Sequence, residues 1–137
     1  MKRWDSLKQN KFYHKFKKLK YVKKSFFLLK GTYGLQVLEF GFLNLNHLKM
    51  IAFFFNKNLK KTGKIWFNVT PNYIETKKPV ETRMGRGKGN IENILVVLQP
   101  GKIFFEVTGF NKKFIEVLLK TILKKLPIKC RILQNKL

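Results

Sequence analysis

The feature that most constrains this chain is an excess of positive charge that a folded domain has to carry. Thirty lysines and arginines face only seven aspartates and glutamates, and the formal net charge is +23 over 137 residues. Hydrophobic residues nevertheless make up 45% of the chain, which is too many for a disordered polycation. Self-repulsion destabilises a free compact state, so the composition predicts one small domain that works against a polyanion.

Nucleic acid is the polyanion that fits best, and an anionic membrane surface is the second candidate. A surface that is basic only for solubility is a third, although solubility asks for a net charge of roughly 2–8 in a small domain. No apolar run reaches the roughly 18–20 residues of a membrane span, so no membrane insertion is expected. No signal-type apolar region follows the basic N-terminus, and we expect the chain to be made where it works.

Residues 1–30 form a basic extension in which aromatic residues interleave with the positive charges. Eleven lysines and arginines accompany one acid, Asp5. We interpret the extension as a segment that orders on RNA, with cations on phosphates and rings on bases or on the domain. A solvated run of charge is the alternative. The residues expected to contact RNA here are Lys11, His14, Lys15, Lys17 and Lys18.

Residues 31–137 are predicted to form a single α+β domain. Strand character is expected over five segments: 33–42, 64–70, 94–99, 102–107 and 128–132. The dipeptide Pro100-Gly101 predicts a hairpin between the third and fourth segments, and 72–81 is interpreted as a polar connection. Helices are expected after the N-caps Asn44 and Asn111. Together these elements predict two helices covering one face of a mainly antiparallel sheet.

Both expected helices carry apolar stripes that we assign to the core. The stripe of the first helix is Leu45, Leu48, Ile51, Ala52, Phe55 and Leu59. The stripe of the second helix is Phe114, Leu118, Ile122 and Leu126, flanked by Ile115, Leu119 and Leu123.

A loop at 83–90 alternates glycines with cationic side chains. Glycine allows close backbone approaches, successive exposed N–H groups can surround an anion, and Arg and Lys add full charges. The loop fails the P-loop pattern because Thr82 and Gly89 stand where Gly and Ser or Thr are needed. A plain connector between strands is the alternative. The residues expected to contact RNA are Arg83, Met84, Gly85, Arg86, Gly87, Lys88, Gly89 and Asn90, together with Lys64.

The sequence contains no set of side chains at a spacing typical of a catalytic site. Neither His14 nor His47 has a cysteine or an acid at ligand spacing, and we expect no metal ion and no cofactor. Cys130 is lone, which excludes an intrachain disulfide, and it is interpreted as a small buried apolar residue. The scattered glutamates, Glu106 among them, are expected to balance local lysines. An enzyme acting on RNA is the runner-up to a binding protein, and it would need catalytic groups that the sequence lacks.

Four motifs carry a resemblance to a known family: Gly63-Lys64-Ile65-Trp66, the loop 81–90, Gln99-Pro100-Gly101-Lys102 and Leu126-Pro127-Ile128-Lys129. In order and spacing the chain closely resembles bacterial large-subunit ribosomal protein L-sixteen, whose archaeal and eukaryotic counterpart is L-ten-e. The resemblance implies an α/β-hammerhead fold, a non-catalytic role, and binding to large-subunit rRNA beside other ribosomal proteins. It also implies that the glycine loop reaches the cleft that holds aminoacyl-site and peptidyl-site tRNA, near the peptidyl transferase centre.

The source of the chain is suggested by its amino-acid usage. Phe, Lys, Asn, Ile and Leu are heavily used and Ala52 is the only alanine, a bias that matches AT-rich codons. The segment 31–35 resembles plant mitochondrial members of the family, whereas 81–83 also resembles plastid members. The family's basic N-terminal motif is only partly present, because Phe16-Lys17 replaces Gly-Arg. We therefore expect a mitochondrially encoded protein of the mitochondrial ribosome, with plastid and bacterial origins as alternatives.

Overall fold

The computed structural model describes residues 27–59, 63–85, 87–109 and 111–135. In these ranges the elements follow the order β1 (Tyr33–Val37), β2 (Gly41–Asn44), α1 (Leu45–Leu59), β3 (Lys64–Phe67), β4 (Tyr73–Lys77), β5 (Asn90–Leu98), β6 (Ile103–Thr108), α2 (Lys112–Leu123) and β7 (Cys130–Gln134). Every strand pair is antiparallel. The predicted α+β class with two helices is confirmed.

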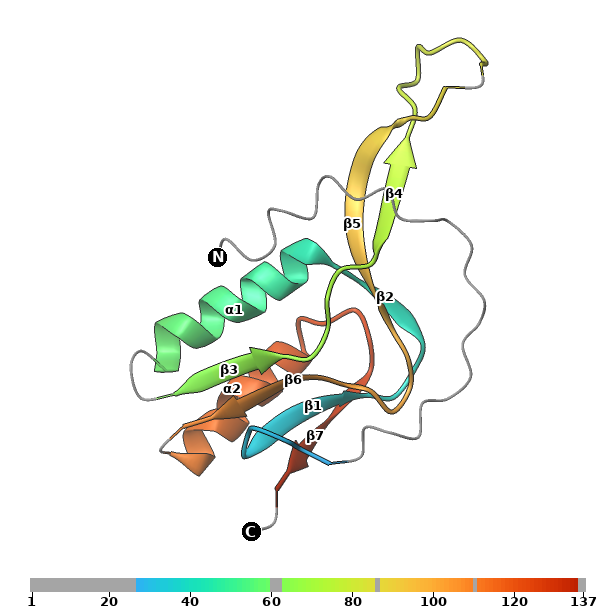
Figure 1. The fold of residues 1–137 in the computed structure, drawn as a ribbon. Helices are drawn as coiled ribbons and strands as arrows, with labels where there is room; N and C mark the ends of the chain where they lie inside the picture. Colours follow the sequence, from blue (N-terminus) through green and yellow to red (C-terminus); the bar gives the residue numbers. More distant parts are fainter. Residues whose placement is uncertain (1–26, 60–62, 86, 110, 136–137) are drawn as a thin grey trace.

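The strands form two sheets where the sequence predicted one. Sheet A has the order β3-β6-β1-β7, and sheet B has the order β2-β5-β4 (Figure 1). The segment 33–42, predicted as one strand, is divided between them, because β1 pairs with β6 whereas β2 pairs with β5. Sheet B is therefore a separate sheet: Leu43, Val96 and Leu98 at its base are buried in the core, and its other end extends away from the core (Figure 1).

The dipeptide Pro100-Gly101 makes the predicted turn but not the predicted hairpin. Gly101 has a φ of 87°, which favours glycine, and the Lys102 N–H donates to the Gln99 carbonyl at 3.2 Å. The Gly101 N–H donates to the carbonyl of Val37 at 2.8 Å, so the turn is fixed against β1. As a result β5 stays in sheet B and β6 enters the centre of sheet A.

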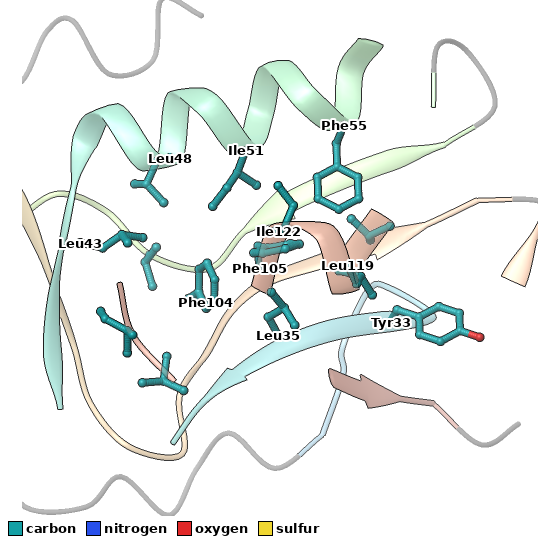
Figure 2. Close-up of a cluster of buried hydrophobic side chains, with 14 of the residues drawn as sticks. Tyr33, Leu35, Leu43, Leu48, Ile51, Phe55, Phe104, Phe105, Leu119 and Ile122 are labelled. Carbon is teal, nitrogen blue, oxygen red and sulfur yellow. The ribbon is translucent and has the colours of Figure 1, made fainter. Parts of the chain in front are cut away.

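The hydrophobic core lies between sheet A and the two helices. Figure 2 shows Leu48, Ile51 and Phe55 of α1 pointing toward Phe105, with Leu119 and Ile122 of α2 beside them. The rings of Phe55 and Phe105 are 5.6 Å apart, and those of Phe104 and Phe105 are 4.8 Å apart at 81°. Edge-to-face rings in a closed core favour one arrangement over others, so these contacts fix how α1 sits on β6.

Both predicted N-caps are confirmed. The Asn44 side-chain oxygen accepts the Asn46 N–H at 3.1 Å, and the Asn111 side-chain oxygen accepts the Phe114 N–H at 3.3 Å. The predicted core stripe of α1 is also confirmed, except that Ala52 is only half-buried.

The predicted stripe of α2 is confirmed at Leu118 and Ile122 and at the flanking Ile115 and Leu119, and it is wrong at its two ends. The buried residues of this helix are Ile115, Leu118, Leu119 and Ile122. Phe114 is 43% exposed, and Leu126 lies beyond the helix end and is half-buried. A strict spacing of four residues drifts by about 40° around the helix at each step, because a turn holds 3.6 residues. The ends of such a row therefore leave the buried face.

The interpretation of 72–81 as a polar connection is wrong, because Tyr73–Lys77 forms strand β4 against β5. Ile74 is the only fully buried side chain of this strand. An edge strand that buries one residue shows little of the alternation from which strands are predicted.

Replacement of Ile122 by alanine should lower the free energy of unfolding by about 2–5 kcal/mol, because the side chain is fully buried between α2 and sheet A. Phe114→Ala, on the same helix, should cost about 1 kcal/mol or less, since that ring is half in water. Urea unfolding of both variants measures the difference. Equal costs would show that the core is not arranged as described.

Candidate nucleic-acid interface

Strands β4 and β5 form an arm that carries the glycine loop away from the core (Figure 1). Their register runs from Tyr73 opposite Leu95 at the base to Lys77 opposite Asn90 at the far end. Residues 78–89 close the arm as a loop, which we call the tip loop. The tip loop therefore lies at the end of the arm that points away from both helices (Figure 1).

Apolar side chains in the tip loop lie entirely in solvent. Val80 and Met84 are 98% and 105% exposed. Two hydrogen bonds shape the backbone here: the Thr82 N–H donates to the Pro79 carbonyl at 3.1 Å, and Lys78 Nζ donates to the Gly85 carbonyl at 2.6 Å. The loop thus has internal order without a core of its own, as a surface made for contact with a partner would.

The three glycines of the tip loop differ in what the fold requires of them. A Cβ on Gly89 would collide with the backbone of Lys77 and Lys78, so the close approach of the two sides of the loop needs glycine there. A Cβ on Gly87 would meet nothing within 4 Å, and one on Gly85 would meet only the Arg83 carbonyl at 3.9 Å. Gly85 does not have the positive φ that demands glycine. The described fold gives Gly85 and Gly87 no internal reason to be glycine.

A hollow of about 180 Å³ lies in the tip loop. It is lined by Lys78, Pro79, Thr82, Arg83, Gly85, Gly87, Lys88, Gly89 and Asn90. Three of these residues are cations and none is an acid. Full positive charges beside glycine backbone form the chemistry that binds an anion such as a phosphate.

Two other predicted contact residues, Met84 and Lys64, do not line this hollow. Lys64 is exposed at the start of β3, opposite Thr108, at the end of the strand remote from the arm (Figure 1). Arg86 lies outside the described residues, and so do the five contact residues predicted in the extension: Lys11, His14, Lys15, Lys17 and Lys18.

Glu106 is a residue whose importance the sequence analysis missed. The residue is 1% exposed on β6, one of the two inner strands of sheet A. One carboxylate oxygen accepts three consecutive backbone N–H groups, those of Leu29 at 3.0 Å, Lys30 at 2.7 Å and Gly31 at 2.8 Å. The other oxygen accepts the Asn68 side-chain amide at 2.7 Å. The end of the basic extension and the segment between β3 and β4 are thereby attached to the same carboxylate.

The charge of Glu106 is stabilised where it lies. Burial by itself raises the pKa of this carboxyl, but the hydrogen bonds from Lys30, Gly31, Asn68 and Leu29 outweigh burial and hold the pKa below its usual value. The expectation that Glu106 balances a lysine ammonium was wrong, because these N–H groups are its partners. The available signal was a lone acid within the apolar run 103–107.

Two other glutamates lie beside lysines, as predicted. Glu39 approaches Lys129 at 3.8 Å and Glu92 approaches Lys77 at 3.6 Å, and both are exposed pairs of the kind that contribute little to stability. Glu116 is different, since it accepts a hydrogen bond from the Tyr33 hydroxyl at 2.9 Å and so ties α2 to β1.

The described residues hold no group of three or more His, Cys, Asp or Glu side chains that could bind a metal ion. Cys130 is half-buried, and burial, followed by the nearby Glu39 carboxylate, raises the pKa of its thiol to about 12. A thiol of this kind stays protonated and is a poor nucleophile. Within the same part of the chain, no helix has the length and apolar character to cross a membrane.

Glu106→Gln should lower the free energy of unfolding by about 1–3 kcal/mol at neutral pH, because an amide cannot replace an anion that accepts three N–H groups. The folded-state pKa of Glu106 is depressed, so its contribution is complete above the ordinary glutamate value of 4.5 and is lost as the pH falls through the lower folded value. Unfolding of both proteins from pH 7 downward tests this. A stability difference that grows toward low pH would contradict it.

Gly89→Ala should destabilise the arm by about 1–3 kcal/mol, since the backbone of Lys77 and Lys78 has to move aside. Gly87→Ala is the matched control, two residues away, and should leave stability unchanged because nothing lies near the added methyl group. Thermal melting and amide chemical shifts of β4 measure both effects. Similar perturbation by the two substitutions would be inconsistent with the described loop.

Comparison with known proteins places these features in a family. Residues 2–133 match the family model described as ribosomal protein L16p/L10e. The chain is 37% identical over 105 residues to large ribosomal subunit protein uL16 of Thermosipho africanus (strain TCF52B), covering 77% of this chain and 74% of that protein. It is 40% identical over 102 residues to the protein of the same name from Mycobacterium avium (strain 104), covering 74% of each. The chain therefore belongs to the L16p/L10e family of ribosomal proteins, as its motifs predicted.

Proposed function

We propose that this structural, non-enzymatic protein of the large ribosomal subunit binds large-subunit rRNA and presents its tip loop to tRNA near the peptidyl transferase centre. The observation that carries the proposal is the hollow of the tip loop, with three cations, no acid and a glycine backbone open to solvent. A polynucleotide backbone is the ligand that such a surface fits.

The glycines support a role in which a ligand comes into close contact with the backbone of the tip loop. Gly87 is unconstrained by the fold, so its lack of a side chain matters only if something outside the protein comes within contact distance of the backbone. Val80 and Met84 stand exposed beside it, where apolar side chains can pack against bases or sugars. If the loop is merely a connector between β4 and β5, none of these three residues affects activity.

Binding to rRNA is assigned to the extension and the basic surfaces rather than to the tip alone. The attachment of Leu29, Lys30 and Gly31 to Glu106 gives residues 1–26 a fixed starting point on the domain. The net charge of +23 supports phosphate contacts as the main source of affinity. The rRNA-binding role that we propose for the extension rests on its composition, since Lys11, His14, Lys15, Lys17 and Lys18 lie outside the described residues.

We also propose that the ribosome in question is mitochondrial. The heavy use of Phe, Lys and Asn, with Ala52 as the single alanine, supports an AT-rich organellar gene. The relatives compared above are bacterial. Mapping the coding sequence to an organellar or a bacterial genome decides between these origins.

Affinity for isolated rRNA fragments should depend steeply on salt. If roughly 6–10 phosphates are neutralised, the binding constant should fall about 10³–10⁵-fold between 50 and 200 mM salt on the duplex scale, and somewhat less on single strands. Filter binding over this range measures the slope. A binding constant that hardly changes would exclude phosphate contacts as the main source of affinity.

Arg83→Ala and Gly87→Val should impair tRNA binding and peptide-bond formation while leaving the melting temperature of the isolated protein almost unchanged. Arg83→Lys should lose less activity than Arg83→Ala, because a lysine keeps the charge but not the bidentate contacts of a guanidinium. The assays use large subunits that carry each variant at full occupancy. Wild-type activity for both Arg83→Ala and Gly87→Val would establish the loop as a connector only.

A further inference from the structure

Helix α2 carries lysines along the side that points away from the core. The side chains that this helix buries are Ile115, Leu118, Leu119 and Ile122. The opposite side is formed by four exposed residues, Lys113, Val117, Lys120 and Lys124. These four recur at intervals of four, three and four residues, so they lie within about 60° of one another around the helix axis. We call them the lysine row.

The charges of the lysine row are not balanced by the protein. Within the described part of the chain, the ammonium groups of Lys113, Lys120 and Lys124 form no hydrogen bond or ion pair. Glu116 is the single acid of α2, and it accepts a hydrogen bond from the Tyr33 hydroxyl at 2.9 Å, which directs it toward β1. The positive charge of the row is therefore left for a group outside the described structure.

The same charges lie where they disfavour the free helix. Lys113 is in the first turn, which contains no acid, and the positive end of the helix dipole repels a cation there. Lys120 and Lys124 are four residues apart on one side of the helix, where like charges repel each other. A row of negative charge bound beside α2 would relieve both repulsions. The arrangement is thus favourable only when an anionic partner is present.

The lysine row has the length of an extended polyanion. From Lys113 to Lys124 it runs about 16 Å at the helical rise of ~1.5 Å per residue, which is enough for several phosphates of one strand. Val117 is 59% exposed within the row, and Phe114 is 43% exposed at its edge. An exposed ring beside a line of cations can stack on an unpaired base while the cations hold the backbone.

We propose that the lysine row binds the phosphate backbone of large-subunit rRNA at a site separate from the tip loop. Figure 1 shows α2 across the core from the tip loop, so the two surfaces contact different parts of the RNA. The proposal rests on the rRNA binding proposed above and assigns part of it to this helix. The basic extension of the same chain does not suit the row, because its eleven lysines and arginines against one acid would be repelled.

Substitution of lysines by glutamine measures the contact in the full-length protein. Lys120→Gln combined with Lys124→Gln removes two neighbouring charges of the row at exposed positions. The probe is large-subunit rRNA transcribed in vitro. A plot of the logarithm of the binding constant against the logarithm of salt concentration should become shallower by roughly 1.4–1.8, because each phosphate contact contributes about 0.7–0.9.

The matched control is Lys77→Gln combined with Lys129→Gln. It removes the same total charge from two exposed lysines that already lie beside glutamates. Its slope should stay close to that of the wild type. Equal changes in the two double variants, or an unchanged slope in the α2 variant, would overturn the lysine row as a site. A steep wild-type slope in that case would leave rRNA binding by the rest of the protein standing, whereas a flat wild-type slope would overturn both proposals.

A crosslinker within the row identifies the occupant in the assembled subunit. Val117→Cys introduces an exposed thiol, whereas the native Cys130 thiol is half-buried with a pKa raised to about 12 and reacts poorly. The variant is labelled with azidophenacyl bromide, assembled into large subunits and irradiated, with the labelled wild type as control. We expect a crosslink to rRNA that the wild type lacks and that Lys120→Gln with Lys124→Gln weakens. Crosslinks to another protein, to residues 1–26 or to nothing would contradict the proposal.

Discussion

The Glu106 carboxylate lies on an inner strand of sheet A and joins both segments that leave the core toward the proposed RNA contacts. Three N–H groups at residues 29–31 bind one of its oxygens, and the Asn68 amide, on the way from β3 to the arm, binds the other. The Asn68 N–H in turn donates to the Phe104 carbonyl at 3.0 Å, so the start of the arm is fixed to β6 twice. An anion buried without these donors would be costly, and with them it stabilises a geometry that neutral side chains would hold less firmly.

The excess of positive charge explains why the acids lie where they do. Seven acidic side chains cannot neutralise thirty lysines and arginines. Glu106 accepts hydrogen bonds from backbone N–H groups, and Glu116 accepts one from the Tyr33 hydroxyl. Glu75 accepts one from the Asn93 side-chain amide on the neighbouring strand of sheet B. The cations remain on the surface, where rRNA would neutralise them on assembly. A protein arranged in this way holds its shape through a few oriented carboxylates and leaves the balance of charge to its partner.

Local signals predicted local structure in this chain. The caps Asn44 and Asn111, the α1 stripe and the turn at Pro100-Gly101 depend on neighbouring residues alone, and all of them are present. The division of 33–42 between two sheets and the pairing of β4 with β5 depend on partners far along the chain, which alternation does not identify. The loop at 83–90 was identified as a candidate site, but its individual glycines could be separated only in three dimensions: Gly89 is required by the fold, and Gly87 is not.

Amide hydrogen exchange in the isolated protein tests the central role of Glu106 most directly. In the wild type, the amides of Leu29, Lys30 and Gly31 should be protected although they lie outside the helices and strands, because their N–H groups are bound to a buried anion. In Glu106→Gln these three amides should lose protection, whereas those that pair β1 with β6 should keep most of theirs. Equal protection of the three amides in both proteins would contradict the account, because the extension would then be attached by something other than this carboxylate.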